Sequence, residues 1–168
     1  PGTSAPAVGG NDSHDRIFAK AIATANVVLS TALTNRQSEI PPAKAGFAIA
    51  GDDPRAFIVG FAGASRNLPI LDAATNGIGS INWTPDRDQV IRRVPLVFTV
   101  GEDFVPSLAI EALRIQQQAQ TYVLKSSNAN GEAAFGEQTG LNHIKVGDIE
   151  IPTDADGGIW LNFRPSNP

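Results

Sequence analysis

The sequence predicts an α/β fold in which helices cover a mixed sheet. Two segments, 13–26 and 106–119, carry apolar residues at the spacing of an amphipathic helix. Short runs rich in β-branched and apolar residues alternate with Gly, Pro, Asn and Asp turns, a pattern typical of strands. A chain of 168 residues is long enough for one domain with its own core.

The chain begins with a segment rich in Pro, Gly, Ala and Ser, residues 1–12, which predicts a mobile arm or a cut loop. Asp12 or Ser13 can cap the first helix, which runs to about residue 26. The elements expected next are a strand (26–34), a loop with two prolines (35–44) and two short apolar runs (45–50 and 55–61). The sequence leaves open whether these two runs pair as a hairpin.

The middle of the chain predicts a short helix at 69–75, entered at a proline, and then a hairpin. Its strands would be 78–83 and 90–100, joined by a turn that Pro85 and Asp86 favour. The helix 106–119 that follows places its apolar residues close to one face and Glu111 away from it. The remaining segments are four strands (122–125, 141–146, 149–151 and 159–163) and a long surface loop (126–140).

Composition excludes several classes of function. The net charge is −4 and no block of Lys or Arg is present, so the chain lacks the electrostatic footprint of a nucleic-acid-binding protein. The longest apolar runs, such as 94–100, are far shorter than the ~20 residues that cross a bilayer. Cysteine is absent, which excludes disulfides, thiolate catalysis and cysteine-type zinc sites.

Arg92 and Arg93 form the most suggestive polar pair. Side chains alternate along a strand, so the two arginines would point to opposite faces. One of them could therefore bind a carboxylate or phosphate while the other faces elsewhere. The alternative is an ion pair within the chain, with Asp86 or Asp88 of the neighbouring turn.

Other motifs predict structure more than chemistry. Two Asp-x-Asp turns, Asp86/Asp88 and Asp154/Asp156, lack the further oxygen ligands and distal Glu of an EF-hand, so they are interpreted as turns in which Asp bonds the backbone. Gly77-Ile78-Gly79 lacks the third glycine of a dinucleotide fingerprint and opens a strand, not a helix.

The two histidines and two tryptophans complete the candidates. His14 lies at a helix start and His143 in an expected edge hairpin, and both are interpreted as surface residues, without a role as a catalytic base. Trp83 and Trp160 could line a ligand pocket or anchor a core or an interface. No catalytic residue, no metal ligand and no cofactor is predicted.

The order of these pieces resembles a known family. A glycine-containing strand ends at Asn82, a turn with aspartates follows, and Arg92-Arg93-Val94-Pro95-Leu96 comes next. This arrangement resembles the signature of the second type of CHASE domain, the extracytoplasmic sensor module of bacterial receptor cyclases and histidine kinases. Further pieces match the family in the same order: Asp15 to Ile22, Asn26-Val27-Val28-Leu29, Leu68-Pro69-Ile70-Leu71, Pro106-Ser107-Leu108-Ala109 and Ile149-Glu150-Ile151-Pro152.

Two features depart from the family pattern. The turn has Asp88-Gln89 where the family usually has Asp-Gly, so the turn geometry that glycine permits is in question. The strands and helix that open the family's domain are also absent, so residues 13–168 resemble the later portion of one sensor domain that is N-terminally incomplete. We expect strand 26–33 to lack a neighbour and an apolar face to be exposed. A second copy or the missing segment, bound as a separate chain, would cover it.

The resemblance implies a ligand-sensing domain on the periplasmic side of a bacterial membrane receptor, without enzymatic activity of its own. Its partners would be an unknown small-molecule or protein signal and a second copy in a homodimer. It would meet the membrane only through the parent receptor's transmembrane helices. Two alternatives remain, a small hydrolase or transferase and a structural oligomerisation module. The residues expected at the ligand site or interface are Asn82, Trp83, Asp86, Asp88, Arg92 and Arg93.

Overall fold

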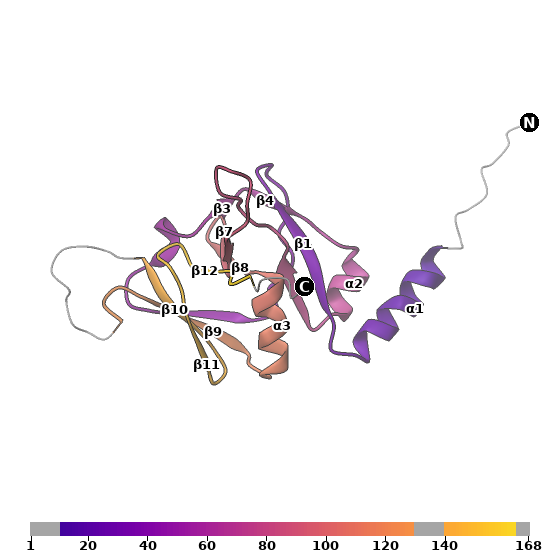
Figure 1. Cartoon of the computed structure of the whole chain (residues 1–168). Helices are drawn as coiled ribbons and strands as arrows, with labels where there is room; N and C mark the ends of the chain where they lie inside the picture. Colours follow the sequence, from indigo (N-terminus) through magenta and orange to yellow (C-terminus); the bar gives the residue numbers. More distant parts are fainter. Residues whose placement is uncertain (1–10, 130–139, 164–168) are drawn as a thin grey trace, which may run out of the picture.

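The computed structural model describes residues 11–129 and 140–163, and the side chains from His14 onward. It confirms the α/β fold class, with small mixed sheets and few helices (Figure 1). The helices are α1 (Asn11–Ala23), α2 (Pro69–Ala74), α3 (Leu108–Gln116) and the short 3-10 helix η1 (Pro54–Ala56). The strands are β1 (Val28–Thr34), β2 (Gly46–Ala50), β3 (Gly60–Phe61), β4 (Gly63–Ser65), β5 (Gly77–Ser80), β6 (Arg93–Pro95), β7 (Val97–Val100), β8 (Asp103–Pro106), β9 (Thr121–Ser126), β10 (Leu141–Val146), β11 (Ile149–Pro152) and β12 (Gly158–Trp160).

The strands form small sheets in the orders β4-β1-β5, β11-β10-β9-β2, β12-β6 and β3-β7-β8. The pairs β1/β5, β2/β9 and β3/β7 are parallel and the other pairs are antiparallel. In Figure 1, α1 lies next to α2 at one end of the molecule, β9 to β11 lie at the other, and α3 stands between them.

The core consists of two clusters of buried apolar side chains. The larger cluster lies around β9 and β10, where Tyr122, Leu124 and Val146 are fully buried. The smaller lies around β7, where Phe98 is fully buried and Phe61 packs against it edge-on. β9 buries alternate residues, as expected where one face of a strand points inward, whereas β7 is buried along its whole length and contributes Val97 to the larger cluster and Phe98 to the smaller.

The predicted hairpin of 78–83 and 90–100 is wrong. β5 ends at Ser80 and pairs in parallel with β1, whereas residues 90–92 belong to no strand. The second run is divided between β6, which pairs with β12, and β7, which pairs with β3 and β8. β5 is buried along its whole length, so partners from distant parts of the chain cover it more completely than one antiparallel neighbour would.

Two other expectations are settled by the pairing. The runs 45–50 and 55–61 do not form a hairpin, because β2 pairs with β9 and most of the second run is η1 and loop. β1 has β5 along Val28 to Thr31 and β4 along Ala32 to Thr34. β1 therefore has β5 on one edge along its first half and β4 on the opposite edge along its second half. The neighbour that is expected to be lacking beside strand 26–33 is thus lacking along only half of each edge.

Glycines in β5 permit α3 to lie against the sheet. A Cβ atom added to Gly77 would lie 2.6 Å from Glu111 Oε1, and one added to Gly79 would lie 2.6 Å from the Cα atom of Leu108. Real Cβ atoms do not approach other heavy atoms so closely. The Gly-Ile-Gly motif therefore serves helix packing, and no nucleotide phosphate is needed to explain it.

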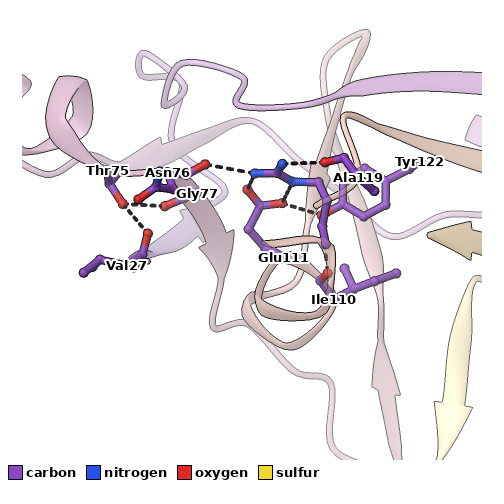
Figure 2. A network of polar contacts seen from close by, with 9 residues as sticks. Val27, Thr75, Asn76, Gly77, Ile110, Glu111, Ala119 and Tyr122 are labelled. Atoms are coloured by element: carbon purple, nitrogen blue, oxygen red, sulfur yellow. Dashed lines mark hydrogen bonds and ion pairs between the residues drawn. The ribbon is translucent and has the colours of Figure 1, made fainter. Parts of the chain in front are cut away.

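A buried ion pair joins α3 to the neighbouring strands (Figure 2). Arg114 donates to Glu111 through Nε (2.9 Å) and Nη2 (2.7 Å), and both side chains are at most 4% exposed. The Tyr122 hydroxyl donates to Glu111 Oε2, and Arg114 also donates to the carbonyls of Asn76 and Ala119. Burial and the Glu111 charge raise the pKa of Tyr122, and the hydrogen bonds that Arg114 donates to Glu111 raise the pKa of Arg114.

The position of Glu111 corrects the expected faces of α3. Glu111, Arg114 and Ile110 are the buried residues of this helix, whereas Ala109 and Ala112 are exposed. Glu111 can face the core because Arg114 and Tyr122 satisfy its carboxylate there, a condition that hydrophobic periodicity does not register.

We predict that Gly79→Ala destabilises the domain by roughly 1–3 kcal/mol, since the new methyl group meets the α3 backbone, which cannot move aside cheaply. Gly46→Ala is the matched control, because a Cβ there would meet only Thr121 at 3.5 Å. Urea unfolding followed by circular dichroism measures both. Equal stability of the two variants would contradict the close packing of α3 on β5.

We predict that Arg114→Leu costs roughly 3–5 kcal/mol, because the Glu111 carboxylate is left buried without its cation. The double variant Glu111→Gln/Arg114→Leu should lose clearly less, since it buries no charge. Glu150→Gln, which removes the exposed pair with Lys125, is the control and should change the stability far less, because water screens an exposed ion pair. Equal losses in the single and double variants would show that the charge of Glu111 is not the cause.

Candidate functional site

The loop between β5 and β6, residues 81–92, contains five of the six residues predicted for the site, and the sixth, Arg93, is the first residue of β6. Asn82 lies near the start of this loop, and its side chain continues the pairing of β5 with β1. The amide accepts from Leu33 N (2.7 Å) and donates to Leu33 O (2.9 Å), and its oxygen also accepts from the Ser80 hydroxyl. Asn82 thus replaces a strand residue, so its side chain has a structural function.

The turn at 86–90 follows the chemistry expected of Asp. Gln89 N donates to Asp86 O (2.9 Å), Asp86 N donates to Val90 O (3.0 Å), and Val90 N donates to Asp88 Oδ1 (3.2 Å). Gln89 has a φ of 65°, in the left-handed region that glycine adopts most easily. The turn therefore keeps the geometry of an Asp-Gly turn, although glutamine occupies the glycine position.

Both arginines pair with this acidic turn. Arg92 donates to both oxygens of Asp88 (2.9 and 2.8 Å) and to Asp86 (3.0 Å). Arg93 makes one longer bond to Asp86 (3.4 Å), and its guanidinium lies over the Trp160 ring at 5.5 Å. The hydrogen bond from Arg92 is the main cause that lowers the pKa of Asp88 to about 2. Of the two interpretations, the intramolecular ion pair is the one observed.

An apolar groove of about 690 Å³ opens beside this loop. Trp83, 58% exposed, and Ile81 line it from the loop, and Leu108, Ala109 and Ala112 line it from α3. Phe163, 68% exposed, lines it from beyond β12. The groove lies at the end of β5 and along α3, and none of its lining residues belongs to β1, beside which an exposed apolar face is expected from the sequence.

A second, more polar cavity of about 480 Å³ lies on the other side of α3. The loop at 40–45 covers it, β8 and Phe47 of β2 form its walls, and Glu111 of α3 borders it. Sequence reasoning missed this cavity, because its residues come from five separate segments and β8 was itself not predicted. The one local signal was Glu111, a charged residue beside the apolar residues of an amphipathic helix.

The remaining candidates stay structural. Asp154 Oδ1 accepts from Gly158 N (2.6 Å), which is the expected Asp turn, and burial is the main cause that raises the pKa of Asp154. Within residues 11–129 and 140–163, no group of three or more His, Asp or Glu side chains could hold a metal ion. His14 on α1 and His143 on β10 lie at opposite ends of the molecule (Figure 1), so they share no catalytic centre.

We predict that Arg92→Gln raises the pKa of Asp88 from about 2 toward its ordinary value of ~3.9. The lowered pKa in the folded state means that this pair stabilises the domain above pH ~4, and that the stabilisation is lost as pH falls toward 2. A carboxyl NMR titration measures the shift. Arg87→Gln is the control, since the Arg87 side chain makes no hydrogen bond or ion pair with Asp88 within the described residues. The same pKa in both variants would contradict the pairing.

The family model of the CHASE2 domain matches residues 3–168, which is nearly the whole chain. Searches of curated proteins and of solved structures found no match. Within the described residues, no helix has the length and apolar character needed to cross a membrane. CHASE2 domains are extracellular sensors of signalling receptors and are not catalytic. The chain therefore belongs to the CHASE2 family of sensor domains.

Proposed function

We propose that this chain is the ligand-sensing domain of a bacterial transmembrane receptor, on the periplasmic side of the inner membrane. Its signal would pass to a cytoplasmic nucleotide cyclase or histidine kinase. Membership of the CHASE2 family supports the sensing part of this proposal. The output enzyme and the bacterial inner membrane come from the resemblance of the signature 77–96.

One observation carries the mechanism. Helix α3 borders the polar cavity with Glu111 and the apolar groove with Leu108, Ala109 and Ala112. A ligand in the cavity and a partner on the groove therefore both contact the same helix. A ligand that binds more tightly when α3 is in one position increases the population of molecules with α3 in that position, and this changes the shape of the groove.

The groove and the neighbouring loop fit a second copy of this chain. A two-fold interface uses the same patch on both subunits, so the patch must be complementary to itself. Here Trp83 and Phe163 expose apolar surface in the groove. Charges of both signs lie beside it, namely the acids Asp86 and Asp88 of the loop and the partly exposed Arg93 at the start of β6. The residues proposed for ligand or dimer contact remain Trp83, Asp86, Asp88, Arg92 and Arg93, with Asn82 supporting them.

The two alternatives have less support. A hydrolase or transferase needs a nucleophile, a base and an orienting group within hydrogen-bond reach of one another. The two histidines of the described chain lie far apart, so they cannot act together in such a catalytic centre. A purely structural oligomerisation module would have the apolar groove, but it would not need the polar cavity beneath loop 40–45.

We predict that the domain dimerises and that Trp83→Ser weakens the dimer about 30-fold in Kd, the loss of a ~2 kcal/mol interface anchor. Phe18→Ser is the matched control, because Phe18 is 53% exposed on α1, outside the groove. Sedimentation equilibrium measures both constants. A monomer at every concentration would contradict the dimer. A companion peptide of a different mass found by native mass spectrometry would show that another chain, and not a second copy, occupies the groove.

The receptor context is tested on the complete gene. We expect hydrophobic spans of ~20 residues flanking this domain and a cyclase or kinase domain beyond one of them. An alkaline phosphatase fusion placed after this domain should be active, since that enzyme works only outside the cytoplasm. A gene without a hydrophobic span would contradict the proposal.

A further inference from the structure

We propose that the cavity beneath loop 40–45 binds a small organic carboxylate with an aromatic or apolar body. This ligand class rests on the proposed sensing function and makes it more specific. The inference depends on three properties of the cavity: an aromatic wall, a lining lysine without an ion-pair partner among the described residues, and a volume suited to one small molecule.

One wall of the cavity is aromatic, and neighbouring rings fix its position. The rings of Phe47 and Phe104 lie with centroids 5.3 Å apart, and Phe47 stacks on the buried ring of Tyr122 at 4.7 Å. Ile78 and Val105 extend this apolar surface. A flat or apolar ligand body would pack here without displacing the core, because the aromatic rings already have fixed neighbours.

Two cationic side chains, Lys44 and Arg55, belong to the lining of the cavity. Lys44 lines it and, within the described residues, makes no hydrogen bond or ion pair. Arg55 also lines it, with its guanidinium 4.4 Å from the centre of the Phe104 ring and bonded to Asp53 (2.8 Å) and to the Glu102 carbonyl (3.1 Å). The Lys44 ammonium is therefore the donor free to meet an anion, with Arg55 beside it.

The acids of the cavity do not cancel this charge. The side chain of Glu102 is 94% exposed and Asp103 is exposed, so water screens both carboxylates. Glu111 lies at the inner wall, but its carboxylate is paired with Arg114 and accepts from Tyr122. A ligand with one carboxylate fits this distribution of charged side chains. A cationic ligand would have to approach Lys44 and Arg55, and no buried lining acid without a partner would attract it.

The volume fits the same class. About 480 Å³ lies within the usual range of small-molecule sites, roughly 300–1,000 Å³, and accommodates one aromatic ring with a short side chain. A ligand of this size would also contact Glu111, the residue that anchors α3 through Arg114 to the Asn76 and Ala119 carbonyls. Ligand binding and the position of α3 are thus connected through one side chain.

The test uses benzoate and phenylacetate as probes, with benzamide and benzylamine as neutral and cationic analogues of the same size. Titration of the isotope-labelled chain should shift the amide signals of the non-proline residues within 40–47 and 102–105. We expect the carboxylates to bind about 10-fold more tightly than benzamide, the gain of one charge-assisted hydrogen bond. No shifts at these residues, or no preference for the anion, would overturn the proposal.

Lys44→Gln removes the charge and keeps a polar side chain only one atom shorter, so it should abolish the preference for benzoate and leave benzamide binding unchanged. Lys20→Gln, on α1 outside the cavity, is the control and should bind like the original chain. The spectrum of each variant without probe verifies its fold. An unchanged preference in Lys44→Gln would contradict the assignment of Lys44.

Sedimentation with and without benzoate separates this inference from the proposed function. Binding in the cavity with a change in the dimer constant supports both. Binding with no change in that constant leaves the ligand class standing and contradicts the coupling through α3.

Discussion

The buried pair of Glu111 and Arg114 is the interaction on which the position of α3 depends. Removing two charges from water is costly, and only close pairing with further hydrogen bonds offsets that cost. Here Tyr122 completes the carboxylate, and the carbonyls of Asn76 and Ala119 complete the guanidinium. Tyr122 belongs to β9, Asn76 to the segment before β5 and Ala119 to the turn between α3 and β9, so the pair connects α3 with two other parts of the fold (Figure 2).

The close approach of α3 to β5 affects both the polar cavity and the apolar groove. Without side chains at Gly77 and Gly79, the helix lies directly against the strand. One side of α3 then contributes Glu111 to the polar cavity, and another side contributes Ala109 and Ala112 to the apolar groove. A sensor needs a ligand site and a surface that reports its occupancy, and a rigid helix shared by both is a short physical connection between them.

Some of the site could be predicted from the sequence. The Asp turns at 86–90 and 154–158 follow from local chemistry, because Asp bonds backbone amides a few residues away. The pairing of Arg92 with Asp86 and Asp88 was one of two stated interpretations, and the residues involved are only a few positions apart. The cavity beneath loop 40–45 could not be predicted, since Lys44, Phe47, Arg55 and Phe104 share no local pattern.

The sequence by itself determined the fold class, the three helices of the described chain, most strands and, through the ordered motifs, the family. These features depend on periodicity, caps and turn residues, which act over a few neighbouring positions. Tertiary structure alone decided that β5 pairs with β1, that residues 90–92 form a loop, and that Glu111 faces inward. Each of these features depends on tertiary contacts that local sequence patterns do not register. The buried strand β5 is stable only when β1 and α3 cover it, and the buried carboxylate of Glu111 is stable only when Arg114 and Tyr122 pair with it.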